Sequence, residues 1–182
     1  MHKIVVAITG ASGSIYPKIL LTKLLSLKDQ WSSLGVIITD NAKIVWQTEL
    51  GDEEYKSYDA KYFSKNDFMA PFASGSGAYD IMIIAPCSMG TLGRIASGVS
   101  GDLISRAADV ILKERRKLIC VIRETPYNLI HIRNMETVTV AGRASSVAWN
   151  STTCPRGVLS AISALCGVTL LLGPRWKAAP PL

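Results

Sequence analysis

Histidine and paired cysteine are scarce in this sequence. The 182 residues include two histidines and four cysteines, and no two cysteines form a C-x-x-C pair: Cys87, Cys120, Cys154, Cys166. Because structural zinc sites need closely spaced Cys or His ligands, we expect no metal. Free thiols favour a reducing compartment, so we expect a cytoplasmic protein, or a mitochondrial one in a eukaryote, although no clear transit peptide is seen.

Long apolar runs are also missing. The longest uncharged apolar stretch, residues 158–172, has fifteen residues, whereas a membrane-spanning helix needs about 20. The first apolar run, residues 4–8, is short and ends in a glycine-rich turn, which is unlike a signal peptide. We therefore expect no membrane span and no secretory leader.

Acidic residues are absent from one end of the chain. The chain carries 20 basic and 14 acidic residues, for a net charge of +6, but residues 143–182 hold four basic residues and no acid. Since no basic patch is interleaved with aromatics, we expect no nucleic-acid partner. The 48% hydrophobic content excludes a disordered chain, and the length suits one domain.

The first 140 residues alternate short β-branched runs with amphipathic ones. The pattern predicts strands at 3–9, 34–38, 79–85 and 117–122, and helices at 15–27, 42–50, 103–116 and 128–138, with a long polar excursion at 51–78. Alternating strands and helices indicate an α/β fold, a parallel sheet with helices on both faces. Ligands of such sheets bind at the carboxyl ends of the strands.

Two glycine- and serine-containing turns follow predicted strands. T-G-A-S-G-S, from Thr9, lies between the first strand and helix, and A-P-C-S-M-G-T-L, from Ala85, follows a later strand. Each turn can bind phosphate through backbone amides at a helix N-terminus, or can simply be a tight turn capped by serine. The first turn has neither the dinucleotide fingerprint nor the P-loop Gly-Lys pair.

Two further motifs each have a structural and a functional interpretation. A-S-G-S-G, from Ala73, is a flexible solvent loop or a lid over a substrate. Arg123-Glu124 follows the strand at 117–122 and is a surface ion pair or a phosphate clamp beside a proton donor. Arg106 and Lys113 are seven residues apart on one helix face, so they can present two cations to one anion.

Taken together, the motifs resemble those of the UbiX/Pad-type flavin prenyltransferases. The resemblance covers residues 3–142 and rests on T-G-A-S-G-S-I-Y, N-D-F-M-A-P-x-A-S-G-S, A-P-C-S-M-G-T-L, S-R-A-A-D-V-x-L-K-E-R-R-K-L and V-I-R-E-T-P-Y-N-L-I-H-I-R-N-M. It implies a Rossmann-like or flavodoxin-like sheet and a homo-oligomer, usually a dodecamer with active sites between subunits. It also implies metal-independent transfer of a dimethylallyl group from dimethylallyl phosphate to N5 and C6 of reduced FMN. The prenylated FMN would serve UbiD-type decarboxylases.

The same resemblance assigns roles to individual residues. It places the FMN contacts at Gly10, Ala11, Ser12, Thr39, Ser88, Met89, Gly90, Thr91 and Arg123. It gives Arg106 and Lys113 the substrate phosphate, and it counts Glu124, as acid and base, with Ser12 and Arg123 among the catalytic residues. The apolar side chains of Phe68 and Met69 would shield the allyl cation from water.

The chain departs from the family pattern after Gly142. No tyrosine occurs after Tyr127, so the tyrosine with which the family binds the allylic phosphate has no counterpart. We therefore expect a flavoprotein domain over residues 1–142 and a divergent tail over 143–182, which either completes the same domain or fails to. A shifted reading frame is one hypothesis for this tail. The alternative function is an FMN-binding subunit whose activity the tail impairs.

Overall fold

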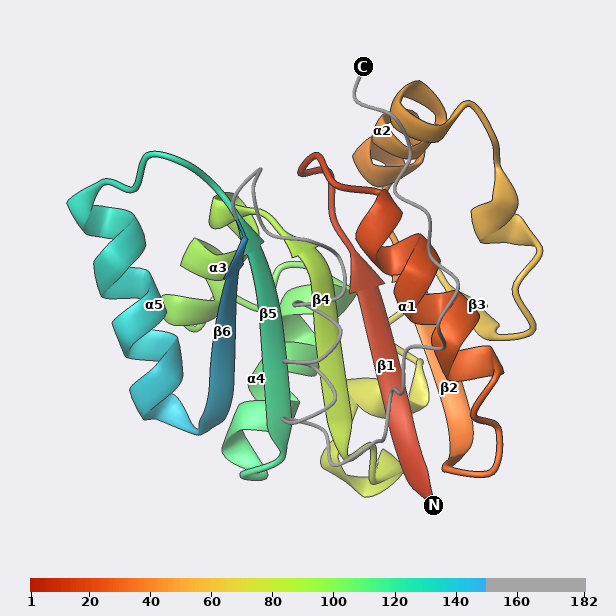
Figure 1. The fold of residues 1–182 in the computed structure, drawn as a ribbon. Helices are drawn as coiled ribbons and strands as arrows, with labels where there is room; N and C mark the ends of the chain where they lie inside the picture. The colour runs from red at the N-terminus through yellow and green to blue at the C-terminus, as the bar shows by residue number, and fades with distance from the viewer. Residues whose placement is uncertain (150–182) are drawn as a thin grey trace.

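The computed structural model describes residues 1–149, which form six strands and five α-helices. The strands are β1 (His2–Ile8), β2 (Trp31–Ile38), β3 (Lys61–Phe63), β4 (Ile81–Cys87), β5 (Lys117–Arg123) and β6 (Arg143–Trp149). The helices are α1 (Ile15–Leu25), α2 (Asp40–Leu50), α3 (Met89–Ala96), α4 (Leu103–Lys113) and α5 (Leu129–Ala141). The predicted α/β class is confirmed, and Figure 1 shows the strands side by side in one sheet.

All strand pairs of the sheet are parallel, in the order β3-β2-β1-β4-β5-β6. The order reverses between β1 and β4, which makes this the switch point where α/β sheets bind ligands. Without the three-residue edge strand β3, the order matches the flavodoxin arrangement. The predicted Rossmann-like or flavodoxin-like topology is therefore present.

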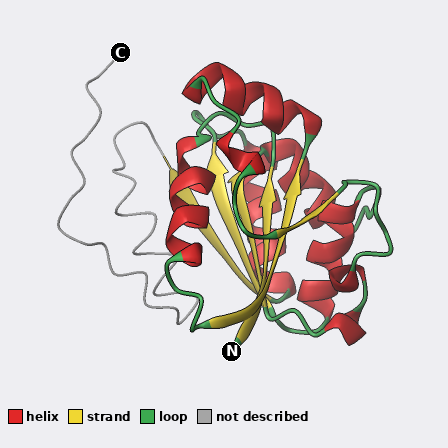
Figure 2. Cartoon of the chain, turned by 90° about the vertical axis from the view of Figure 1, so that its right-hand side faces the viewer, coloured by secondary structure: helices red, strands yellow, loops and turns green. Residues whose placement is uncertain are grey.

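The two faces of the sheet carry separate cores, because side chains alternate along each strand. On β1, Ile4, Val6 and Ile8 face a core that α1 and α2 complete, with Trp46 fully buried. Val5 and Ala7 face the other core, which α3 and α4 cover. Figure 2 shows helices on both sides of the sheet. This layering leaves the strand ends as the places where loops can build a site.

Two strands were not predicted from the sequence. The excursion at 51–78 contains β3 together with three short 3-10 segments. Residues 143–149, the start of the predicted divergent tail, form β6, which pairs with β5 from Lys117–Arg143 to Arg123–Trp149. The rest of the predicted tail lies outside the described residues.

The described part of the chain offers no membrane-spanning segment. None of the helices within residues 1–149 has both the length and the hydropathy needed to cross a bilayer. The two cysteines in that part, Cys87 and Cys120, are buried and free.

Candidate active site at the switch point

A cavity of about 300 Å³ opens at the carboxyl ends of β1, β2 and β4. Its lining residues come from the three strand ends and from the segments that follow β3 and α3: Thr9, Gly10, Thr39, Asp40, Asn41, Lys65, Ser88, Thr91, Arg94 and Asp102. Four of them, Gly10, Thr39, Ser88 and Thr91, were predicted from the sequence as cofactor contacts. Residues that are up to 81 positions apart in the sequence thus meet at the switch point.

Thr9 ties two strand ends together in this cavity. Its side chain is buried, and its hydroxyl donates to the Pro86 carbonyl oxygen at 2.7 Å and accepts from the Ser88 N–H at 3.0 Å. Thr9 is β-branched, which suits the end of a strand. The pairing of β4 with β5 is irregular between Ile84 and Cys87, and the Thr9 hydroxyl gives backbone groups of this region a hydrogen-bond partner. Thr9 therefore fixes the position of Ser88 relative to Gly10.

Two helices begin at the cavity with hydroxyl caps. The Thr39 side chain accepts from the Ala42 N–H at 3.2 Å at the start of α2, and Ser88 accepts from the Thr91 N–H at 3.3 Å at the start of α3. The Ser88 and Thr91 hydroxyl oxygens are 3.0 Å apart. Helix N-termini carry partial positive charge, so two of them directed at one cavity favour an anion.

Gly10 permits the close approach of the β1–α1 loop to α2. A Cβ atom at this position would lie 2.7 Å from the Cβ of Asn41, which is closer than real Cβ atoms approach one another. A larger residue would therefore push the first turn of α2 away from the loop and distort the cavity.

The charges in the cavity are arranged as two ion pairs. The Lys65 Nζ lies 2.9 Å from the Asp40 Oδ2, and the Arg94 Nη2 lies 3.3 Å from both the Asp102 Oδ2 and the Thr91 Oγ1. Lys65, followed by Lys43, lowers the pKa of the Asp40 carboxyl below its ordinary value. The two cations and two carboxylates cancel, so the cavity itself has no net charge from these four side chains.

The glycine-rich loop is held by a residue that sequence reasoning missed. The Glu49 carboxylate, at the end of α2, accepts from the Gly13 N–H at 3.0 Å through both oxygens and from the Ser14 N–H at 2.7 Å. Ser14 is the N-cap residue of α1, but its side chain makes no capping hydrogen bond. Glu49 thus takes the role at the helix N-terminus that either a phosphate or a serine cap was expected to fill.

Six other predicted site residues do not line this cavity. Ala11 and Ser12 are half-buried in the β1–α1 loop, and Met89 and Gly90 lie in the first turn of α3. Arg123 is the exposed last residue of β5, and Glu124 is half-buried directly after it. All six therefore lie at, or directly after, the carboxyl ends of strands.

Arg106 and Lys113 are placed differently. The Arg106 Nε donates to the Ala73 carbonyl oxygen at 3.1 Å, and Lys113, paired with Glu114 at 2.7 Å, ends α4 four residues before β5 begins. Lys113 therefore lies near the amino edge of the sheet, opposite the switch-point cavity. Within one chain, these two cations do not meet in that cavity.

The serine- and glycine-rich segment of the third motif packs against α4 and the loop that follows it. Arg116 donates to the Gly75 carbonyl oxygen at 2.9 Å and to the Tyr79 carbonyl oxygen at 3.4 Å, and the Lys3 Nζ donates to the Gly77 carbonyl oxygen at 3.1 Å. Phe68 and Met69, which precede it, are exposed, and neither lines the cavity. Within residues 1–149, no group of three His, Cys, Asp or Glu side chains is placed to hold a metal ion.

Comparison with known proteins identifies the family. The sequence model of the Flavoprotein family matches residues 1–157. The flavin prenyltransferase UbiX of Methanocaldococcus jannaschii is 47% identical over 135 residues, which cover 73% of this chain and 71% of that protein. The chain belongs to the flavin prenyltransferase family. The UbiX of Pseudomonas aeruginosa is 40% identical over 150 residues, covering 74% of this chain and 70% of that protein.

Solved structures of flavin prenyltransferase relatives have the same fold. AnUbiX (PadA1), in complex with FMN and dimethylallyl pyrophosphate, superimposes with a TM-score of 0.79 at 32% identity, covering 98% of this chain and 99% of that chain. A dodecameric FMN-dependent UbiX-like decarboxylase from Escherichia coli O157:H7 gives a TM-score of 0.81 at 30% identity, covering 97% of this chain and all of that one. The comparisons give no support to the alternative of an impaired FMN-binding subunit.

Proposed function

We propose that this protein transfers a dimethylallyl group from dimethylallyl phosphate to N5 and C6 of reduced FMN. The observation that carries the proposal is the convergence of Gly10, Thr39, Ser88 and Thr91 in one cavity at the switch point. Gly10 belongs to one motif of the flavin prenyltransferase family and Ser88 and Thr91 to another, while Thr39 follows β2; the chain belongs to this family. AnUbiX, with a TM-score of 0.79, was solved with FMN and a dimethylallyl donor.

The residues of the cavity fit the phosphate of FMN. Two capped helix N-termini, hydroxyl groups and a glycine that permits close approach form the kind of donor set that phosphates prefer. We assign the FMN contacts to Gly10, Ala11, Ser12, Thr39, Ser88, Met89, Gly90, Thr91 and Arg123. Reduced FMN, when bound, supplies the electron-rich ring positions that accept the prenyl group.

The end of β5 supplies the acid–base chemistry of the proposal. Glu124 is half-buried directly after Arg123, so both residues lie at the carboxyl edge of the sheet. Breaking the carbon–oxygen bond of dimethylallyl phosphate develops negative charge on the phosphate, which a fixed cation stabilises. Glu124 would donate a proton to the departing phosphate and later accept one from the flavin ring. Ser12, in the β1–α1 loop, would contact the phosphate side of the flavin.

We assign Arg106 and Lys113 to the substrate phosphate in the site of a neighbouring subunit. In their own chain neither lines the switch-point cavity: Arg106, one turn after Asp102, donates to the Ala73 carbonyl oxygen, and Lys113 lies near the opposite edge. A homo-oligomer would bring the α4 helix of one copy to the site of another, and the Escherichia coli relative is dodecameric. The protein is proposed to act without a metal, as a homo-oligomer.

We propose that a UbiD-type decarboxylase receives the product, because prenylated FMN is a cofactor and needs an enzyme that binds and uses it. We place the protein in the cytoplasm, since Cys87 and Cys120 are free thiols. No nucleic-acid partner is part of the proposal.

The proposal is tested by incubating the protein anaerobically with reduced FMN and dimethylallyl phosphate and recording the mass of the extracted flavin. A flavin heavier by one dimethylallyl group supports prenyl transfer. Recovery of FMN alone, from a protein that binds FMN, contradicts it and leaves an FMN-binding protein without this activity.

A further inference from the structure

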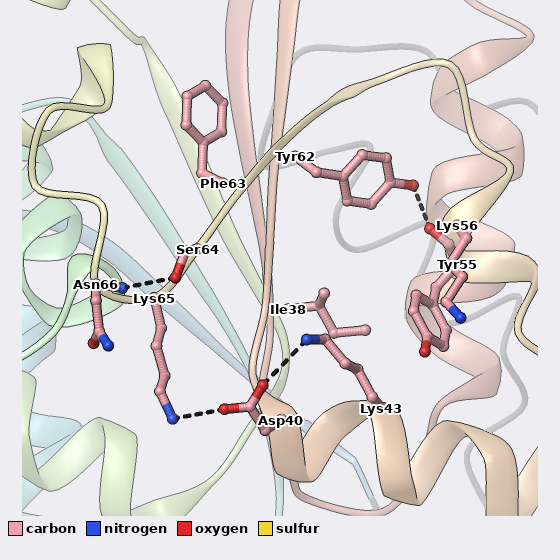
Figure 3. Close-up of a pocket in the computed structure, with 10 residues that line it drawn as sticks. All are labelled: Ile38, Asp40, Lys43, Tyr55, Lys56, Tyr62, Phe63, Ser64, Lys65 and Asn66. Carbon is pink, nitrogen blue, oxygen red and sulfur yellow. Dashed lines mark hydrogen bonds and ion pairs between the residues drawn. The ribbon is translucent and has the colours of Figure 1, made fainter.

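A second cavity adjoins the first and shares a wall with it. This cavity, of about 460 Å³, lies between α2 and the segment around β3, and its lining includes Ile38, Lys43, Tyr55 and Tyr62. Asp40 and Lys65 line both cavities, so their ion pair separates them. Figure 3 shows the second cavity, with Lys65 and Lys43 reaching Asp40 from two elements.

The Asp40 carboxylate has two cationic partners, one in each direction. The Lys65 Nζ lies 2.9 Å from its Oδ2, and the Lys43 Nζ lies 3.1 Å from its Oδ1. If Lys65 moves away, Asp40 keeps Lys43 and is not left as an unpaired charge. Since 65% of the Asp40 side chain and 42% of the Lys65 side chain are exposed, water also lowers the energy needed to separate the pair.

The backbone of Lys65 is held by a hydrogen bond, while its side chain has rotatable bonds. The Leu103 N–H, at the start of α4, donates to the Lys65 carbonyl oxygen at 2.7 Å. This contact holds Lys65 next to Asp102, which lines the first cavity. A lysine side chain has a flexible four-carbon stem, so its ammonium group can change partner without a change in the backbone.

The other cation of the first cavity is more constrained. Arg94 contacts both Thr91 and Asp102, and the Asp102 carboxylate also caps α4 through Ser105. Moving Arg94 would take a cation from the carboxylate that caps α4, whereas moving Lys65 leaves Asp40 paired with Lys43. Of the two cations, Lys65 is therefore the one that can leave its carboxylate partner with the smaller loss of interaction energy.

We propose that Lys65 leaves Asp40 and binds the phosphate of the flavin, while Lys43 retains Asp40. This inference rests on the proposed function, because it takes FMN as the cofactor in the first cavity. It makes Lys65 a specificity-determining residue that favours the binding of FMN over riboflavin, which has no phosphate. It also predicts that Asp40 weakens FMN binding, since its negative charge repels the phosphate and competes with the phosphate for Lys65.

Flavin titrations of the full-length protein test the inference. Lys65→Met should weaken FMN binding about ten-fold, the loss expected for one partly exposed charge-assisted hydrogen bond, and leave riboflavin binding unchanged. Lys56→Met is the matched control, because Lys56 lines only the second cavity and pairs with Glu53 rather than with Asp40. The control should bind both flavins as the unmodified protein does.

The outcomes separate this inference from the proposed function. An unchanged ratio of FMN to riboflavin affinity in Lys65→Met overturns the role of Lys65, while the function stands. If the unmodified protein binds no FMN, the proposed function fails, and this inference fails with it.

A second variant gives a test of opposite sign. Asp40→Asn should tighten FMN binding several-fold, because it releases Lys65 and removes a negative charge beside the phosphate. Weaker or unchanged FMN binding in Asp40→Asn contradicts the transfer of Lys65, even where Lys65→Met fails to fold.

Discussion

Replacing Thr9 by valine should destabilise the protein through the loss of two hydrogen bonds. Valine has nearly the shape of threonine, so the packing at the end of β1 is retained. The change removes the donor to the Pro86 carbonyl and the acceptor of the Ser88 N–H, at a residue whose exposed fraction is 3%. A buried polar group without its partner costs about 1–3 kcal/mol, so the two together predict a loss of about 2–6 kcal/mol.

Thr9→Ser is the matched control for this prediction. Serine keeps the hydroxyl and loses only one methyl group, which predicts a loss of about 1 kcal/mol. Urea denaturation of the two variants gives the difference in unfolding free energy. An FMN titration shows whether Ser88, an assigned FMN contact, is still positioned to bind the cofactor. The reasoning is refuted if Thr9→Val unfolds at the same urea concentration as Thr9→Ser, or if both bind FMN equally.

The remaining predictions concern chemistry, backbone space and pH. Glu124→Gln should retain FMN binding and lose most prenyl transfer, measured by the mass of the flavin product; full activity would remove Glu124 from the mechanism. Gly10→Ala should weaken FMN binding in a titration, because its Cβ would lie 2.7 Å from that of Asn41. Lys18, with the Glu54 N–H and the Trp46 indole, lowers the pKa of Asp52 to about 2. Because this pKa is depressed in the folded state, its stabilisation is present above about pH 4 and is lost as the pH falls toward 2. Asp52→Asn should flatten the acid side of the unfolding profile, and an unchanged profile would contradict this.

The central strands could be predicted from the sequence because they are buried on both faces. β1 and β4 are nearly continuous runs of apolar, often β-branched residues, which is typical of parallel sheets. β3 has only three residues, which is too short for a periodic signal. β6 has the sequence R-A-S-S-V-A-W, without an apolar run that would mark a strand. It forms a strand in the structure through its pairing with β5.

Gly10, Ser88 and Thr91 could also be predicted, because they lie in recognisable turns after strands, and the family resemblance added Thr39. The ion pairs could not. Asp40 and Lys65 are 25 residues apart, and Glu49 lies 36 residues from the Gly13 amide that it binds. Only the fold brings such residues together, and single charged side chains on a helix or loop carry no pattern that marks them.

Helical periodicity placed Arg106 and Lys113 on one face of α4, but it could not tell which edge of the sheet each residue lies near. A spacing of seven residues fixes the side of a helix, while the direction of the chain determines which end is near the strand carboxyl ends. α4 runs from the switch-point edge, where Asp102 lines the cavity, toward the start of β5. Its last residue, Lys113, is therefore far from the cavity of its own chain.

The most direct test of the account measures both products of one reaction. Reduced FMN and dimethylallyl phosphate are incubated with the protein, and inorganic phosphate and prenylated flavin are quantified together. The account predicts one phosphate released for each flavin that gains a dimethylallyl group, at a rate that falls in Glu124→Gln. Phosphate release without a prenylated flavin, or no reaction by a protein that holds FMN, would contradict it.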